Sequence, residues 1–510
     1  MKILKSALSL LLALVIVFSC CSVAFAYESE GYAMVYLAGF GDTNIYYEDD
    51  PEKKPLFYPL DTDRVIGNLK NMDDYIIKSI KNREPDLLYT CIYNYVWDTF
   101  GMLRMEPDGT SVDGVVAAPI ELNYTGNNRY VFSYDWRLDP FVIAEQLHDY
   151  IAKVKADAPS KGMKSDKVEL VASSFSANTA LAYLKLYEDS LDDLDSIIFC
   201  VPSIGGISMV SELFSGELNI GPDSLKNFML GTEGVEFIGE FMDLLDEMGL
   251  LKPLVEAMLV PTLRAALSRA LTDLFRDFVS TIPAVWTCVT DEYFEKAMIH
   301  MYGEDYASPD QPYADHIARV TDFHYNIKLK ANDIIGATKE NNPNAHMAVI
   351  CKYGTPALPV SKHETVLTDG VVAIELSSFG ATCADFFQSF PEDYKQQKHQ
   401  EINMISPDRQ IDASTCLFPY HTWFIKGLFH SQQPEDYHLK VLPAIAYGDL
   451  DITSDPDFPQ YMILDSEDDQ KINPYTEVEQ EEQTMLYKIW MIFKKMVLLP
   501  KTIWNKLFGR

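Results

Sequence analysis

Short runs of β-branched and aromatic residues alternate with longer stretches of helical hydrophobic spacing along most of the chain. This alternation is typical of a mainly parallel β-sheet with helices on both faces. We therefore predict an α/β fold. The expected strands are residues 33–37, 129–134, 167–172, 196–200, 347–352 and 422–427.

The segment between residues 205 and 345 has few strand signals and interrupts this pattern. Within it, residues 237–278 are rich in Leu and Met at helical spacing, broken by two prolines. We predict a helical cap over the loop face of the sheet, inserted between core parts at 27–204 and 346–460. A packed helical subdomain without a gating role fits the same pattern.

The N-terminal residues have the pattern of a signal peptide. A short N-terminal region that contains lysine precedes an apolar segment at residues 7–18, and an A-x-A cleavage site ends at Ala26. This order predicts a signal peptide over residues 1–26 and an exported, secreted or envelope-associated chain. A lipoprotein signal at Cys20 is the alternative, although Phe18 is bulky for such a site. An uncleaved anchor is disfavoured because the apolar segment is too short to span a bilayer.

Six cysteines follow the predicted signal peptide, and an even number in an exported chain permits disulfides. Buried free thiols are the other possibility that the sequence leaves open. No two cysteines are spaced as C-x-x-C, so neither a zinc ribbon nor a redox pair is expected. The six are Cys91, Cys200, Cys288, Cys351, Cys383 and Cys416.

The end of the chain, residues 461–510, changes character twice. Residues 465–482 hold eight acidic side chains and one Lys, which is typical of a solvated linker. Residues 484–510 hold six basic side chains and no acid, with apolar residues at helical spacing. We predict a basic amphipathic helix that lies on a membrane surface. Docking of the same helix on the acidic core is an equal alternative.

Composition narrows the classes of function. The chain has 510 residues, of which 47% are hydrophobic, which is enough for a large core. There are 42 Lys and Arg against 75 Asp and Glu, and the formal net charge of −33 disfavours nucleic-acid binding. Nucleotide-binding glycine loops and H-E-x-x-H are absent from the sequence, so we expect no cofactor and no metal.

The most informative segment is residues 168–178, where a buried strand runs through small residues into a helix. A serine nucleophile in a tight strand–turn–helix elbow needs small residues two positions away on either side. Ser174 satisfies this with Ala172 and Ser176, whereas other serines in the run would place larger side chains there. The N–H of Phe175 would then point from the helix start toward a developing oxyanion.

A second oxyanion donor is expected after the first strand. The turn Gly39-Phe40-Gly41 has a glycine on each side of Phe40, whose backbone N–H is the predicted donor.

The segment Tyr134-Asp135-Trp136-Arg137, about 40 residues before Ser174, resembles the lecithin:cholesterol acyltransferase family of α/β-hydrolases and related bacterial lipases. The Gly39–Gly41 turn, residues 353–356 and residues 368–372 look like the family's first loop, a later loop and the acid loop. The similarity touches roughly residues 33–205 and 345–430. It implies an α/β-hydrolase fold with a serine nucleophile. Asp135 and Arg137 are interpreted as a structural ion pair.

The chain also departs from the family pattern. Ser173 stands where the family has His, and Ala172 and Ser176 stand where it has glycines. These departures affect the expectation of efficient catalysis and leave the expected fold unchanged.

A serine nucleophile needs a histidine base and a carboxylate that orients it, in the chain order Ser, Asp or Glu, His for this fold. Asp369 precedes a glycine after the fifth expected strand, and His430 lies three residues past the sixth. We predict these two as acid and base. His438 is the alternative base, and His421 lies before the sixth strand, at the opposite edge.

Together these features predict an exported, serine-dependent lipid ester hydrolase or O-acyltransferase that works through an acyl-enzyme. The expected partners are a lipid ester and, through residues 484–510, a membrane surface; the oligomeric state stays open. The alternative is a catalytically inactive α/β-hydrolase fold that binds lipid, glycan or a protein partner.

Overall fold

The computed structural model describes residues 31–57, 84–217, 261–357, 366–386, 388–448, 450–465 and 468–475. The predicted export signal, the cap residues 237–260 and the predicted helix over 484–510 lie outside the described residues. None of the helices in the described part combines the length and hydropathy that a membrane crossing requires.

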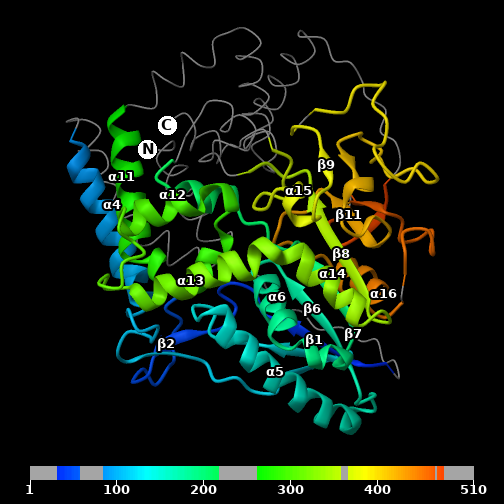
Figure 1. Ribbon diagram of the computed structural model, residues 1–510, viewed down its shortest axis with the longest axis horizontal. Helices are drawn as coiled ribbons and strands as arrows, with labels where there is room; N and C mark the ends of the chain where they lie inside the picture. The colour runs from blue at the N-terminus through cyan, green and yellow to red at the C-terminus, as the bar shows by residue number, and fades with distance from the viewer. Residues whose placement is uncertain are drawn as a thin grey trace, which may run out of the picture.

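A nine-stranded sheet runs through the molecule in the order β13-β12-β11-β8-β7-β6-β1-β5-β4. Figure 1 shows where its strands β1, β6, β7, β8 and β11 lie. The strands from β12 to β5 pair in parallel, and β13 and β4 close the two edges in antiparallel pairs. The fold is therefore α/β with a mostly parallel sheet. The strands are β1 (Ala33–Leu37), β4 (Tyr124–Gly126), β5 (Arg129–Phe132), β6 (Val168–Ser173), β7 (Leu194–Cys200), β8 (His346–Tyr353), β11 (Thr422–Lys426), β12 (Tyr461–Leu464) and β13 (Ile472–Pro474).

The central strands are buried along their whole length. Every residue of β6 and β8 is buried, and their sequences VELVAS and HMAVICKY are mostly apolar. Such near-continuous apolar runs are characteristic of parallel strands covered on both faces. Glu169 of β6 is an acidic residue within this apolar run, and burial raises the pKa of its carboxyl to about 8.

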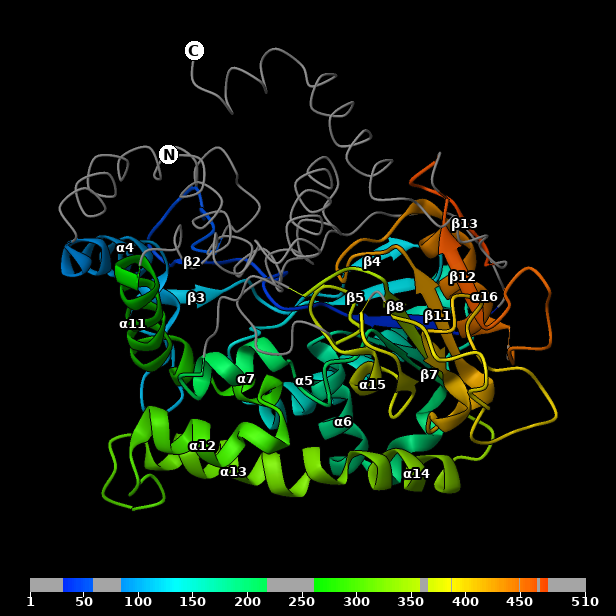
Figure 2. The ribbon, with the colours of Figure 1, turned by 90° about the horizontal axis from the view of Figure 1, so that it is seen from above.

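Helices between the strands cover the sheet (Figure 2). Helix α5 (Pro140–Asp157) packs against β1 and β5, and it starts where the Asp139 carboxylate accepts from the Phe141 N–H at 2.9 Å. Helix α6 (Ser176–Leu186) packs against β6, α5 and α14 (Ala331–Asn341). Helix α16 (Leu442–Tyr447) packs against β7 and β8 and follows the π-helical turn η9 (Tyr437–Val441).

The described part of the segment between β7 and β8 consists of helices and the turns that connect them, and it contains no strand. It contains α7 (Ser208–Phe214), α11 (Pro261–Asp277), α12 (Asp291–Tyr302), α13 (Ala314–Asn326) and α14. Helix α11 packs along α4 (Pro85–Phe100), which comes from the first part of the chain. The hydroxyls of Tyr89 and Tyr93 on α4 donate to Asp273 and Asp277 on α11, each at 2.8 Å. These contacts join the inserted helices to the rest of the fold.

Three smaller elements complete the architecture: the strand pairs β2–β3 and β9–β10, and helix α15. Their bounds are β2 (Ile45–Tyr47), β3 (Val115–Ala117), β9 (Thr382–Cys383), β10 (Ile411–Asp412) and α15 (Ile374–Ser377). The six cysteines in the described part are free thiols, and four of them are buried. Of the two possibilities, disulfides or free thiols, the structure therefore has free thiols.

Candidate active site

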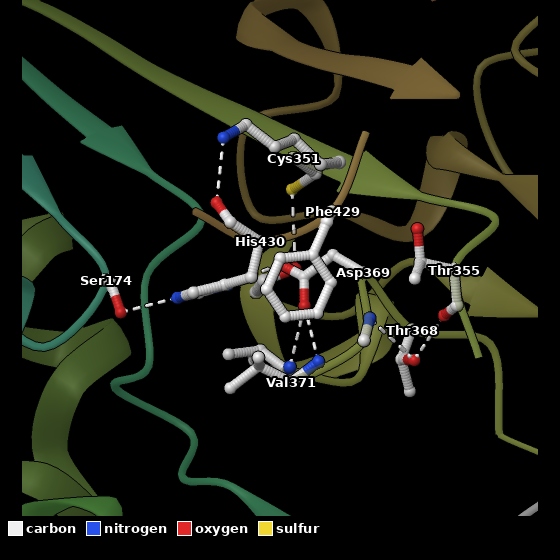
Figure 3. A network of polar contacts seen from close by, with 12 residues as sticks. Ser174, Cys351, Thr355, Thr368, Asp369, Val371, Phe429 and His430 are labelled. Carbon is white, nitrogen blue, oxygen red and sulfur yellow. Dashed lines mark hydrogen bonds and ion pairs between the residues drawn. The ribbon is translucent and has the colours of Figure 1, made fainter. Parts of the chain in front are cut away.

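Three side chains predicted from separate parts of the sequence meet beyond the ends of β6, β8 and β11, strands of the central part of the sheet (Figure 3). Ser174 follows β6, Asp369 lies in the loop after β8, and His430 lies in the loop after β11. The Ser174 Oγ is 2.6 Å from His430 Nε2, and His430 Nδ1 is 2.7 Å from Asp369 Oδ2. With Nδ1–H directed to the carboxylate, the lone pair of Nε2 faces the serine hydroxyl.

Ser174 is held in a strained backbone conformation. Its φ is +54°, in the left-handed region that residues with a Cβ rarely adopt. The turn is fixed on both sides, because the Ser174 N–H donates to the Cys200 carbonyl at 2.8 Å and the Ser174 carbonyl accepts from the Ser203 N–H at 3.2 Å. Strain of this kind, kept in place by surrounding structure, is typical of functional sites.

The elbow accepts a serine where the family resemblance expects a glycine. Ser176 is buried, and its hydroxyl accepts from the Ser173 N–H at 2.9 Å. The same oxygen lies 2.9 Å from the Ser173 carbonyl and 3.3 Å from the Leu37 carbonyl of β1. The Ser176 side chain is thus used inside the turn and leaves the position of Ser174 undisturbed.

The carboxylate of Asp369 is held in place by backbone hydrogen bonds in addition to its contact with His430. Its Oδ1 accepts from the N–H groups of Val371 and Val372 at 3.0 and 2.8 Å, and its side chain is fully buried. These bonds require a tight turn at Gly370, which has a φ of +95°. A Cβ at Gly370 would lie 2.5 Å from the ring of Phe429, so only glycine fits there.

His430 is held to the same loop by its backbone. Its N–H donates to the Asp369 carbonyl at 2.8 Å, and its side chain is almost completely buried. The backbone and the ring are therefore both tied to Asp369. This removes most of the freedom that an imidazole on a loop would have.

The two predicted oxyanion donors lie on adjoining segments. The ring of Phe40 packs edge-on against the ring of Phe175, with the centroids 5.4 Å apart. The Gly39 N–H donates to the Asp42 carboxylate at 2.6 Å, which shapes the turn that carries Phe40. Phe175 directly precedes the first turn of α6, where backbone N–H groups attract negative charge. Their role as oxyanion donors stays a prediction.

An apolar cavity of about 120 Å³ has Phe40 in its wall, the residue whose ring packs against Phe175, and reaches into the helical region. Its walls come from the Phe40 turn, from Trp136, from α4, α7 and α11, and from the segment after α11. Lining residues include Phe57, Val96, Phe100, Met209, Val210, Leu213, Leu271, Leu274, Phe275 and Phe278. The cavity could not be predicted from the sequence, because only the fold brings α4 against α11.

The other candidate residues lie elsewhere. Asp135 and Arg137 form a bidentate ion pair at 2.7 and 2.9 Å, with Arg137 fully buried. His438 lies in η9, where burial lowers the pKa of its imidazole to about 4. His421 stands at the start of β11, 5.4 Å from the His346 ring. The histidine beside Ser174 is His430.

Comparison with protein-family models, with curated proteins and with solved structures gave no match to this chain. The resemblance to the lecithin:cholesterol acyltransferase family therefore stays a prediction from the quoted motifs. The geometry of the chain's own residues defines the site as a serine–histidine–aspartate arrangement beside an apolar cavity.

Proposed function

We propose that this protein is an exported, serine-dependent hydrolase or O-acyltransferase of lipid esters with an α/β-hydrolase fold. The observation that carries the proposal is the unbroken hydrogen-bond chain from Ser174 through His430 to Asp369, at 2.6 and 2.7 Å. An imidazole placed this way accepts the serine proton while the carboxylate stabilises the imidazolium that forms.

The reaction follows from this arrangement. His430 Nε2 takes the proton of Ser174 as Oγ attacks the ester carbonyl, and a tetrahedral oxyanion forms. The N–H groups of Phe40 and Phe175 are proposed to bind that oxyanion. His430 then protonates the leaving alcohol, and the acyl group stays on Ser174. Water or an alcohol acceptor, activated by His430, releases the acyl group and restores the serine.

The apolar cavity supports a lipid acyl group as the substrate. Its wall includes Phe40, one of the two proposed oxyanion donors, and its lining is apolar side chains. Each methylene buried in such a space contributes about 0.8 kcal/mol. Because α7 and α11 supply much of its wall, we propose that the inserted helices act as a cap that covers the acyl chain. The predicted export signal and C-terminal helix fit a substrate at the cell envelope.

The test is ester turnover with a matched pair of serine variants. Ser174→Ala should lose p-nitrophenyl ester hydrolysis to the background rate, because no nucleophile remains. Ser173→Ala, one residue earlier in the same turn, should retain turnover within a few-fold. Full activity in Ser174→Ala contradicts the proposal. An inactive wild type that is folded points to the alternative, an α/β-hydrolase fold that only binds lipid, glycan or a protein partner.

Hydrolysis and acyl transfer share every step up to the acyl-enzyme. Adding a long-chain alcohol to the assay separates them: an acyltransferase forms the new ester in competition with free acid, whereas a hydrolase forms free acid alone.

A further inference from the structure

A buried lysine contacts the backbone of the loop that carries His430. Lys352 lies in β8 and is only 1% exposed. Its ammonium donates to the His430 carbonyl at 2.8 Å and to the Gln432 carbonyl at 2.7 Å. The ring of Tyr437 faces the same ammonium at 5.0 Å. Figure 3 shows the hydrogen bond to the His430 carbonyl as a dashed line from an ammonium nitrogen near Cys351.

Placing an ammonium here is costly unless its donors are satisfied, because burial removes the hydration of the charge. Two carbonyl acceptors and an aromatic face meet that requirement. An apolar side chain of similar length would fill the same space without a charge to desolvate. The specific contribution of the lysine is therefore that it holds these two carbonyl groups in fixed positions.

We infer that Lys352 is a positioning residue that fixes His430 for proton transfer with Ser174. This inference rests on the proposed function. The N–H of His430 is bound by the Asp369 carbonyl, and its carbonyl is bound by Lys352. The backbone is thus fixed on both sides of the imidazole, on one side by a strand in the interior of the sheet. With the ring tied to Asp369, the position of Nε2 is determined.

The adjacent strand provides a matched control. Lys426 of β11 is paired with Tyr353, the next residue after Lys352. Its ammonium binds the Asp408 carboxylate at 2.7 Å and the Tyr475 hydroxyl at 3.0 Å. This lysine is also mostly inside the protein, and its hydrogen bonds are made away from the His430 loop. Removing this ammonium breaks an ion pair and a hydrogen bond without releasing that loop.

The experiment compares Lys352→Met with Lys426→Met in the full mature chain. For each variant, kcat and KM for p-nitrophenyl octanoate, the rate of phosphonylation by a fluorophosphonate, and the melting temperature are measured. We expect Lys352→Met to lower kcat and the phosphonylation rate roughly 10- to 100-fold with KM unchanged, since a small misplacement of a catalytic group has an effect of this size. Lys426→Met should stay within a few-fold of the wild type in both rates.

Equal rates in Lys352→Met and the wild type contradict the inference, as does a loss that both lysine variants share in proportion to their melting temperatures. If Lys352→Met gives no folded protein, Lys352→Gln replaces it, because a neutral amide retains a donor in a side chain of similar size. A wild type that is neither active nor labelled overturns the proposed function and this inference together. A labelled wild type with an unaffected Lys352 variant overturns the inference alone.

Discussion

The substitution Asp369→Asn tests how the carboxylate controls the imidazole. In the wild type, Oδ1 accepts from the Val371 and Val372 N–H groups at 3.0 and 2.8 Å, and Oδ2 accepts from His430. An asparagine has a single oxygen, and the two backbone donors hold that oxygen in place of Oδ1. Its NH₂ group then faces His430 Nδ1.

The consequence is the wrong tautomer of His430. A nitrogen that receives a hydrogen bond from the amide must carry a lone pair, so the proton moves to Nε2. Nε2–H cannot accept the proton of Ser174, although the hydrogen-bond geometry and the fold are retained. In serine hydrolases with this arrangement such a change lowers kcat roughly 10⁴-fold, which corresponds to about 5.5 kcal/mol of transition-state stabilisation.

The assay is kcat for an activated ester at pH 7, together with the melting temperature. Asp412→Asn is the control, because Asp412 is likewise fully buried and accepts from the Ser414 and Gln397 N–H groups at 3.0 Å, away from the site. We expect the control to lose stability but less than tenfold in kcat. A kcat of Asp369→Asn within tenfold of the wild type would show that the carboxylate does not control the tautomer of His430.

Three further results are expected. Burial raises the pKa of Glu169 to about 8 from 4.5, so the folded chain holds that proton more tightly than the unfolded chain does. The free energy of unfolding of the wild type should therefore fall by up to about 5 kcal/mol as pH rises from about 4.5 to about 8. Glu169→Gln should lessen this loss in thermal melts at pH 5, 7 and 9. Parallel profiles of melting temperature against pH for the variant and the wild type would contradict this expectation. Gly370→Ala should lower kcat at least tenfold, because its Cβ would meet Phe429 next to His430. Gly303→Ala is the control: Gly303 has a similarly positive φ of +89°, its Cβ would meet no more distant part of the chain within 4 Å, and kcat should stay unchanged; equal kcat in the two variants would count against the fixed acid loop. Leu274→Trp should fill part of the cavity and exclude about three methylenes, lowering kcat/KM for a laurate ester roughly 50-fold relative to an acetate ester; an unchanged ratio would show that the acyl chain lies elsewhere.

Much of the sheet could be predicted because its central strands are covered on both faces. Residues in β6, β7 and β8 form short, almost unbroken apolar runs, and such runs are visible without knowledge of the fold. The strands β4, β12 and β13, which lie at the edges of the sheet or next to one, were not predicted. They are three or four residues long and partly exposed, so their apolar pattern is weak.

The residues of the candidate site could be predicted from the sequence for a different reason. Ser174 is marked by the small residues that a tight elbow requires, and Asp369 is marked by the glycine that its turn requires. Lys352 has no such mark, because its two acceptors belong to a loop 78 and 80 residues later in the chain. The hydroxyl of Ser176 was seen as a departure from a pattern, and only the folded turn shows the atoms that it contacts.

The central claim is that Ser174 is an activated nucleophile. The most direct measurement is intact-mass analysis of the mature protein after reaction with a fluorophosphonate, followed by peptide mapping. We predict a single phosphonyl adduct on Ser174 that His430→Ala abolishes. A folded protein that gains no adduct, or gains one at another serine, would show that Ser174 is not an activated nucleophile.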